Sequence, residues 1–234
     1  MPPGRQERDS RMNVTYIHHS GFLVETERFY YLFDYAKGRL PKMDPAKPVY
    51  VLASHSHGDH FNPEVFSLLA EAGMQQIRAV LSDDIHPPAD TSALLVSPET
   101  EYALGEAQKL KTLRSTDLGI AFLIEDRDAL IYHAGDLNDW VWDEESEADN
   151  AEMTENYRAQ IALLAKTLRG RTIDVAFVVL DPRQEDDYHR GLVWFLEKIS
   201  AKRVYPMHYW GESAIIQRFL ADYPQYKQQI QITE

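Results

Sequence analysis

Short runs of apolar, aromatic and β-branched residues, separated by polar turns, dominate the first part of the chain. They predict four strands, over Val14–Ile17, Phe22–Glu25, Phe29–Asp34 and Val49–Ala53. The pattern then changes. Asn62 followed by Pro63 is typical of an N-cap and a first helical position, so a helix is predicted over Pro63–Ala72.

The rest of the chain continues this alternation of strand and helix patterns. Further strands are predicted over Ile77–Leu81, Ala93–Val96, Gln108–Leu113, Ile120–Glu125, Ala129–His133, Ile173–Leu180 and Arg203–Pro206. A hairpin turn is expected at residues 126–128, and an acidic loop at Asn138–Asn150. Helices are predicted over Met153–Leu168, Gly191–Ile199 and Glu212–Leu220.

No segment has the composition of a linker, and the helices fall between strand-rich stretches that they can cover. We therefore expect one layered α/β domain over residues 13–234, with two packed sheets. Residues 1–12 are polar and rich in proline, which predicts a disordered tail.

The composition narrows the function classes. The 234 residues are 44% hydrophobic, which suffices for a core, and they include no run of about 18 apolar residues that would span a membrane. No secretory signal is visible, so a cytoplasmic protein is expected. A formal charge of −13 disfavours nucleic acid as a partner, although a small anionic substrate can still be bound where a dication reverses the local field.

A cluster of metal-binding side chains follows the strand at Val49–Ala53. His55, His57, Asp59 and His60 fall within six residues, and Gly58 lets the backbone turn between them. The chain has no cysteine, so any metal must be held by imidazole and carboxylate groups, which are common ligands of zinc and similar ions.

Two later residues can complete such a site. Asp136 follows the strand at Ala129–His133, and His208 follows the strand at Arg203–Pro206. Because ligands gather beyond the carboxyl ends of strands in α/β sheets, both residues are expected to lie beside the histidine cluster.

The order His55-x-His57-x-Asp59-His60, Gly135-Asp136, His208 resembles the metallo-β-lactamase superfamily. The flanking segments, at residues 18–25, 132–136 and 206–209, resemble the branch of metal-dependent hydrolases that includes L-ascorbate-6-phosphate lactonase. The resemblance implies a four-layer αββα sandwich with one or two divalent metals at the edge between the sheets. It implies zinc first, with manganese or iron as alternatives.

The same resemblance implies a division of the ligands. His55 and His57 would hold one metal, Asp59, His60 and His208 would hold the other, and Asp136 would bridge them or serve the second. A bridging hydroxide would then be the nucleophile.

One departure from the family pattern concerns the first metal. The family has another histidine before Gly-Asp, but residues 113–119 read Leu-Arg-Ser-Thr-Asp-Leu-Gly. Asp117 can replace the absent imidazole and give a site richer in oxygen, which suits manganese or iron as well as zinc. The alternatives are a chain that works with one metal and a chain that has lost catalysis.

Other residues carry weaker expectations. Asp59, His19 and Tyr209 are the candidates for catalysis. His19 can orient a ligand or touch substrate, against the alternative of a structural role at a strand end. Tyr209 can polarise a substrate oxygen, against the alternative of packing only. Asp34 and His133 are candidates to support a ligand. Arg183, together with the neighbouring His189 and Arg190, is a candidate to bind an anionic group, against the alternative of a solvated loop with ion pairs.

The expected function is therefore that of a metal-dependent hydrolase of a small ester, lactone, amide or phosphoester. The alternative is a non-catalytic protein that binds a small ligand on the same scaffold. The sequence gives no indication of the oligomeric state.

Overall fold

The central strands of the first half are buried along nearly their whole length, so their sheet has two apolar faces. The computed structural model describes residues 12–106, 108–127 and 129–233. In the first sheet six strands lie in chain order, the first three antiparallel and the last three added in parallel. They are β1 (Asn13–His18), β2 (Gly21–Glu25), β3 (Tyr30–Phe33), β4 (Val49–Ala53), β5 (Ile77–Ser82) and β6 (Ala93–Val96).

The second sheet is built from the later strands in the order β12-β11-β10-β9-β8-β7. The pairs from β7 to β10 are antiparallel, while β10, β11 and β12 run parallel. The strands are β7 (Glu101–Ala103), β8 (Gln108–Arg114), β9 (Ile120–Asp126), β10 (Ala129–His133), β11 (Ile173–Val179) and β12 (Ala201–Met207).

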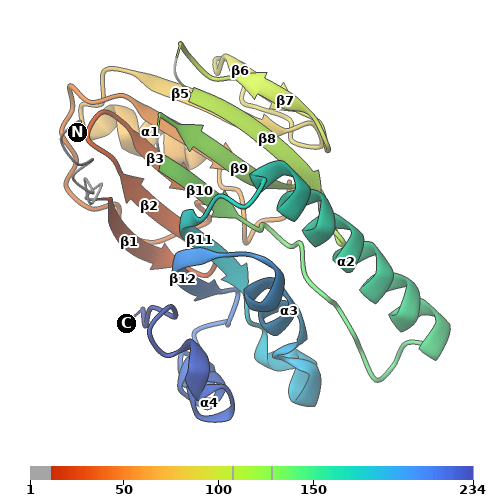
Figure 1. The fold of residues 1–234 in the computed structure, drawn as a ribbon. Coiled ribbons are helices and arrows are strands. Elements are labelled where there is room, and N and C mark those ends of the chain that lie inside the picture. Colours follow the sequence, from red (N-terminus) through yellow and green to blue (C-terminus); the bar gives the residue numbers. More distant parts are fainter. Residues whose placement is uncertain (1–11, 107, 128, 234) are drawn as a thin grey trace, which may run out of the picture.

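Helices cover the outer faces of the two sheets (Figure 1). The α-helices are α1 (Glu64–Glu71), α2 (Glu147–Leu168), α3 (Arg190–Lys198) and α4 (Ala214–Asp222), with 3₁₀ turns at Pro182–Asp187 and Pro224–Tyr226. Helix α1 packs Val65 and Leu69 against Leu32 and Val51 on the outside of the first sheet. Helices α2 and α3 lie against the second sheet, so the expected αββα sandwich is confirmed.

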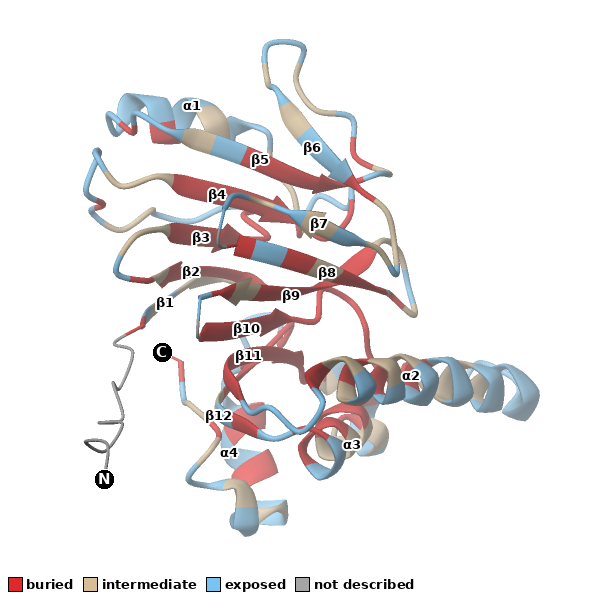
Figure 2. Ribbon diagram, turned by 45° about the horizontal axis from the view of Figure 1, so that its top comes forward, coloured by how far each residue is buried: buried red, intermediate tan, exposed pale blue. Residues whose placement is uncertain are grey.

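Aromatic side chains fill the space between the sheets. Phe22 contacts Phe177 with ring centroids 4.3 Å apart, and Phe33 contacts Phe122 at 6.1 Å. All four rings are fully buried, and each contributes roughly 1.5–3 kcal/mol by leaving water. Figure 2 shows this buried interior between the sheets, and the exposed N-terminal half of α2 that projects beyond them.

Some element boundaries differ from the sequence prediction. Helix α2 begins at Glu147, within the expected acidic loop, because Ser146 caps it by accepting a hydrogen bond from the Asp149 N–H. Glu147 and Asp149 favour this end since helix N-termini are electropositive. At α1, Asn62 accepts from the Glu64 N–H, although the helix proper starts one residue later than predicted.

Some predicted segments lie outside the described residues, and some short elements were not predicted. The predicted tail at residues 1–11 and the turn residue Asp128 lie outside the described residues, whereas Met12 is buried in the core. Strand β7 and the turn at Pro182–Asp187 were not predicted, because three-residue strands and single 3₁₀ turns leave no periodic pattern.

Gly119 brings the turn between β8 and β9 against the end of β4. Its φ is +73°, and a Cβ at this position would lie 2.6 Å from the His55 Cβ and collide with the Ser54 carbonyl oxygen. The Ile120 N–H donates to that same carbonyl oxygen at 3.0 Å. Glycine is therefore required where the second sheet touches the histidine cluster.

Replacing Gly119 by Ala is expected to lower the free energy of unfolding by about 3 kcal/mol or more, because the substitution adds a backbone collision to the cost of a left-handed residue. Urea denaturation measures this change. Gly170→Ala is the matched control, since Gly170 has a φ of +80° but no atom within 4 Å of the added Cβ. Its expected cost is about 1 kcal/mol, and equal costs for the two variants would contradict the prediction.

Candidate metal centre

Five strands that have a parallel neighbour are each followed by a polar side chain. Asp34 follows β3, His55 follows β4, Asp136 follows β10, Asp181 follows β11 and His208 follows β12. Because these strands run in parallel within each sheet, their carboxyl ends meet at one edge of the sandwich.

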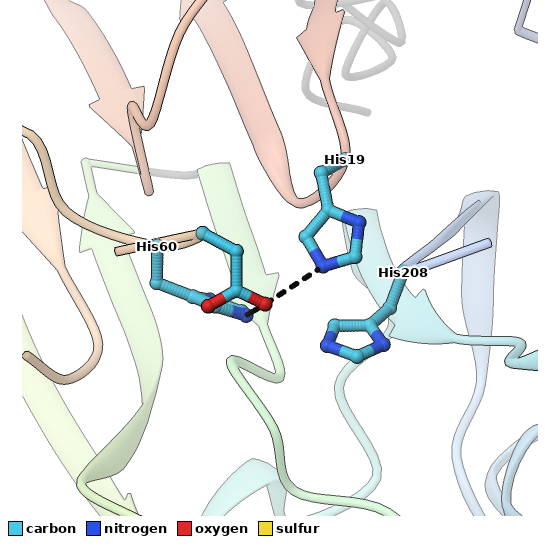
Figure 3. Close-up of side chains that lie close together, drawn as sticks. His19, His60 and His208 are labelled. Atoms are coloured by element: carbon cyan, nitrogen blue, oxygen red, sulfur yellow. Dashed lines mark ion pairs between the residues drawn. The ribbon is translucent and has the colours of Figure 1, made fainter. Parts of the chain in front are cut away.

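The side chains at this edge form two groups whose ligand atoms lie within 4.8 Å of one another. One group contains His19, Asp59, His60 and His208, and the other contains His55, His57 and Asp136. Figure 3 shows the imidazoles of His19, His60 and His208 close together, each from a different segment of the chain.

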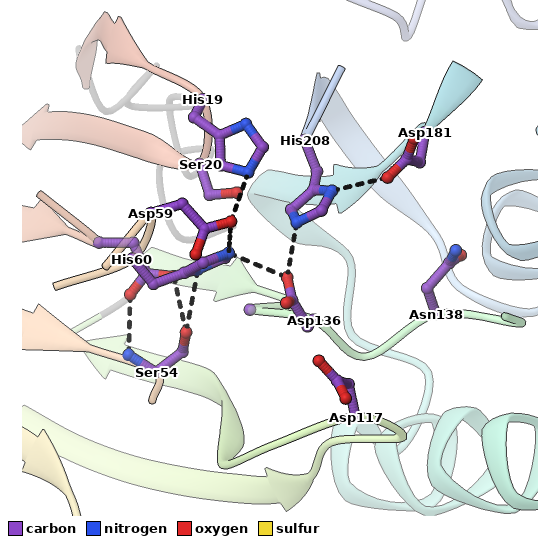
Figure 4. Close-up of polar contacts among 12 residues, drawn as sticks. His19, Ser20, Ser54, Asp59, His60, Asp117, Asp136, Asn138, Asp181 and His208 are labelled. Atoms are coloured by element: carbon purple, nitrogen blue, oxygen red, sulfur yellow. Dashed lines mark hydrogen bonds and ion pairs between the residues drawn. The ribbon is translucent and has the colours of Figure 1, made fainter. Parts of the chain in front are cut away.

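Asp136, a member of the second group, also lies beside His60 and His208 of the first (Figure 4). Its Oδ1 is 3.1 Å from Nε2 of His60 and 3.3 Å from Nε2 of His208. Its Oδ2 faces the other group, 3.4 Å from Nε2 of His55. One carboxylate thus presents one oxygen to each group, which is the arrangement of a bridging ligand.

The donor atoms fit a bound cation. Nε2 of His19, His55 and His60, and Oδ1 of Asp136, are buried without a hydrogen-bond partner among the described residues. Buried polar atoms in folded proteins are normally paired, because an unpaired one costs roughly 1–3 kcal/mol. Atoms of imidazole and carboxylate that converge unpaired on one region satisfy this requirement when they share a divalent ion.

Two buried aspartates orient the imidazoles from behind. Asp34 Oδ2 lies 2.7 Å from Nδ1 of His60 and accepts a hydrogen bond from the Ser54 hydroxyl. Asp181 Oδ2 lies 3.0 Å from Nδ1 of His208. Both contacts place the Nδ1 proton of the imidazole against a carboxylate and leave Nε2 facing the site, as metal-binding histidines require.

A third support holds His19 in place. Its φ is +54°, and its N–H donates to the Tyr16 hydroxyl at 2.9 Å. The imidazole of His133 accepts from the Gly135 N–H through Nδ1, so its Nε2–H donates to the Ser20 carbonyl oxygen at 2.9 Å. His133 is therefore a link between the sheets that positions the His19 turn, and it does not face the donor atoms.

The charges at the site reinforce one another. Burial opposes ionisation of Asp136, but the imidazoles of His60 and His208 hold the pKa of its carboxyl well below the usual range. Burial lowers the pKa of His60, yet the carboxylates of Asp136 and Asp34 outweigh it and raise that pKa well above the usual value. The contact with His19 lowers the pKa of Asp59, which stays ionised at neutral pH.

Burial lowers the pKa of His19 and of His55, so both imidazoles are neutral at neutral pH. Neutral imidazole is the form that binds metal. His60 can bind a metal through Nε2 only when that nitrogen carries no proton. Metal affinity is therefore expected to rise with pH until His60 has lost its proton.

The structure brings together most of the residues that the sequence singled out. His55, His57, Asp59, His60, Asp136 and His208 all belong to the two groups. His57 is exposed, so this side of the site opens to solvent. His19, predicted as a catalytic residue, lies at ligand distance from the others.

Two predicted site residues belong to neither group. The Tyr209 hydroxyl bonds Thr233 at 2.8 Å, and its ring stacks on Tyr16 in the core. These contacts favour packing over contact with substrate as the role of Tyr209. Asp117 is exposed on the turn between β8 and β9, near Asp136 in Figure 4, but it belongs to neither group.

Arg183, His189 and Arg190 do not form one cluster. Arg190 is turned toward Asp139 and Thr154, and His189 packs its ring against Tyr223, so neither joins Arg183 in one anion site. The support of His208 by Asp181 was not predicted. The signal was present, since Asp181 ends a buried strand parallel to the one before His208.

Comparison with known proteins agrees with this geometry. A sequence profile of the β-lactamase superfamily domain matches residues 13–151, more than half of the chain. The chain belongs to the β-lactamase superfamily. Among the described residues of this superfamily member, no helix has both the length and the apolar character needed to cross a membrane. No curated protein sequence matches the chain significantly.

Solved structures show the same fold at low sequence identity. A metallo hydrolase from the hyperthermophilic archaeon Ignicoccus hospitalis superposes with a TM-score of 0.66 and 15% identity, over 95% of each chain. A metal-dependent hydrolase from Parabacteroides distasonis gives a TM-score of 0.60 and 14% identity, over 95% of this chain and 93% of that one.

A third structure extends the range of chemistry on this fold. The diiron β-hydroxylase CmlA from Streptomyces venezuelae superposes with a TM-score of 0.60 and 13% identity. It covers 99% of this superfamily member but only 54% of its own chain. The comparisons and the His/Asp groups together support a metal-dependent hydrolase in general terms.

Replacing Asp34 by Asn is expected to weaken metal binding about 10–100-fold, because the change removes the carboxylate that orients and charges the His60 imidazole. Competition with a fluorescent zinc chelator measures the affinity. Asp174→Asn is the control, since Asp174 is also buried but accepts the Leu130 N–H within the sheets, away from the site. Equal affinities of the Asp34 variant and the unmodified protein would refute the support role.

Proposed function

We propose that this chain is a metal-dependent hydrolase of a small ester, lactone, amide or phosphoester. The observation that carries the proposal is the convergence of unpaired, buried imidazole and carboxylate atoms on both sides of Asp136. A purely structural cluster would satisfy these atoms with hydrogen bonds among themselves.

The two groups suggest which residues hold which ion. His19, Asp59, His60 and His208 would hold one, His55 and His57 the other, with Asp136 shared. When bound, a divalent ion polarises a carbonyl or phosphoryl oxygen and lowers the pKa of a coordinated water toward about 7. The donor set suits zinc first, and manganese or iron where oxygen ligands predominate.

The residues of the chain supply orientation and charge. The Asp59 carboxylate is partly exposed and ionised, so it can accept a hydrogen bond from the attacking water and fix its direction. Nε2 of His19 lies 3.4 Å from Oδ2 of Asp59, so both atoms can face the same ion. The protein's remaining task is to position the substrate carbonyl or phosphoryl group opposite this water.

The substrate class follows from charge and from resemblance. The formal charge of −13 disfavours a nucleic-acid substrate and favours a small molecule. The segments flanking the ligands resemble the branch of hydrolases that includes L-ascorbate-6-phosphate lactonase, so a small lactone or ester that carries an anionic group is the preferred substrate class. The proposed site of action is the cytoplasm.

Replacing Asp59 by Ala is expected to reduce hydrolysis at least 100-fold across a panel of 4-nitrophenyl esters and bis(4-nitrophenyl) phosphate, because water loses both its orienting group and part of its metal site. Circular dichroism and urea denaturation check that the fold is kept. Full activity in the variant would show that Asp59 is not part of the catalytic machinery. A metal-loaded parent protein that hydrolyses nothing would favour the non-catalytic alternative.

Asp117 is proposed as the stand-in for the histidine that the family places in this segment. Asp117→Ala is expected to lower the bound metal by up to one equivalent, measured by plasma mass spectrometry after dialysis, and Asp117→His is expected to strengthen zinc binding. Asp186→Ala, which removes another exposed carboxylate that belongs to neither group, is the control. Unchanged stoichiometry in Asp117→Ala would retire the idea.

A further inference from the structure

Indole rings form a wall beside His208 on one side of the metal centre. Trp140 is buried, donates its Nε1–H to the Asp136 carbonyl oxygen, and stacks on Trp142 with centroids 5.8 Å apart. Trp210 lies 4.4 Å from the His19 ring and 5.5 Å from the His208 ring. The wall therefore adjoins the ligand groups directly.

The guanidinium of Arg183 lies between two of these rings. Its Cζ is 4.5 Å from the centroid of Trp210 and 5.8 Å from that of Trp142. Such contacts with indole faces favour the planar cation of arginine over the ammonium of lysine. The stacking holds the guanidinium plane in one orientation.

One edge of this guanidinium is used and the other is open. Nε and Nη2 donate to the fully buried carboxylate of Asp181, which also receives the Nδ1–H of His208. Among the residues that the structure describes, Nη1 of Arg183 has no hydrogen-bond partner, and 49% of the side chain remains exposed. The open edge can therefore donate hydrogen bonds to a bound group.

The backbone that presents the wall is in an unusual conformation. His208, Trp210 and Gly211 all have positive φ, at +65°, +52° and +82°. Left-handed non-glycine residues are uncommon and cost free energy, so their clustering marks a segment held for a purpose beyond packing. In this segment Trp210 is 46% exposed beside the ligand groups.

We propose that Arg183, held between Trp142 and Trp210, binds an oxyanion of the substrate, a carboxylate or phosphate, while the scissile bond lies at the His/Asp groups. Guanidinium nitrogens recognise such groups by charge-assisted hydrogen bonds. This inference rests on the proposed hydrolase function and names the feature by which that site selects its substrate. The nearby cation Arg190 does not compete for the role, because Asp139 and Asp187 engage it.

The test compares two esters of similar size. 4-Carboxyphenyl acetate carries an anion on the leaving group, and 4-(methoxycarbonyl)phenyl acetate is its neutral counterpart. In zinc-loaded Arg183→Gln, the ratio of kcat/KM for the anionic ester to that for the neutral ester is expected to fall about tenfold. Zinc content is measured on the same samples.

Arg218→Gln is the matched control. Arg218 has the same exposed fraction of side chain, 49%, lies 4.3 Å from the Tyr188 ring, and pairs with a carboxylate, but it lies on α4. The ester ratio is expected to stay unchanged in this variant. If Arg183→Gln lowers kcat/KM for both esters equally, together with the zinc content, Arg183 only supports Asp181, and the proposal is overturned.

A binding measurement separates this proposal from the proposed function. Calorimetric titration of the zinc-loaded protein with benzoate and with phenylphosphonate reads anion binding without any turnover, and benzamide serves as the neutral ligand. The affinity for at least one anion is expected to fall about tenfold in Arg183→Gln. If the protein hydrolyses neither ester but still binds these anions through Arg183, the hydrolase function fails while the anion site stands. Unchanged affinities for both anions in the variant would overturn the anion site itself.

Discussion

The structure depends on the sharing of one buried carboxylate, Asp136, by imidazoles from both halves of the chain. Its two oxygens face His60, His208 and His55 at 3.1–3.4 Å. Taking a carboxylate out of water is costly unless positive charge surrounds it, and the imidazoles that compensate it are themselves buried. The buried carboxylate and the imidazoles at this edge therefore stabilise one another, and together they favour a bound cation.

The two sheets are arranged to make this set possible. Each combines an antiparallel hairpin region with a parallel region, and the parallel strands of both sheets deliver their last residues to the same edge. Left-handed backbone at His19, Asp34 and His208 then turns these side chains inward. The strain is confined to the site, while ordinary strands and a core of aromatic rings carry the fold.

Most of the strands and candidate ligands were predictable from the sequence, because the candidate ligands directly follow predicted strands. His55 to His60, Asp136 and His208 follow apolar runs that only a sheet explains, and strand ends converge by topology. Tyr209 could not be placed in the same way. The positive φ of His208 changes the direction of the chain, so Tyr209 points into the core, and no residue pattern predicts that change.

The start of α2 was missed for a different reason. Acidic residues that favour a helix N-terminus also have the composition of a solvated loop.

The origin of the ligands in both halves of the chain has a consequence for biosynthesis. His208 follows β12, the last strand of the second sheet, and β12 in turn is flanked by residues 229–231, which bond to Val204. A nascent chain that has exposed only the His55–His60 segment holds half of a coordination sphere. With the proposed ligands, tight metal binding therefore requires that the carboxyl-terminal strand has docked. The metal then stabilises a fold in which all the strands are already in place.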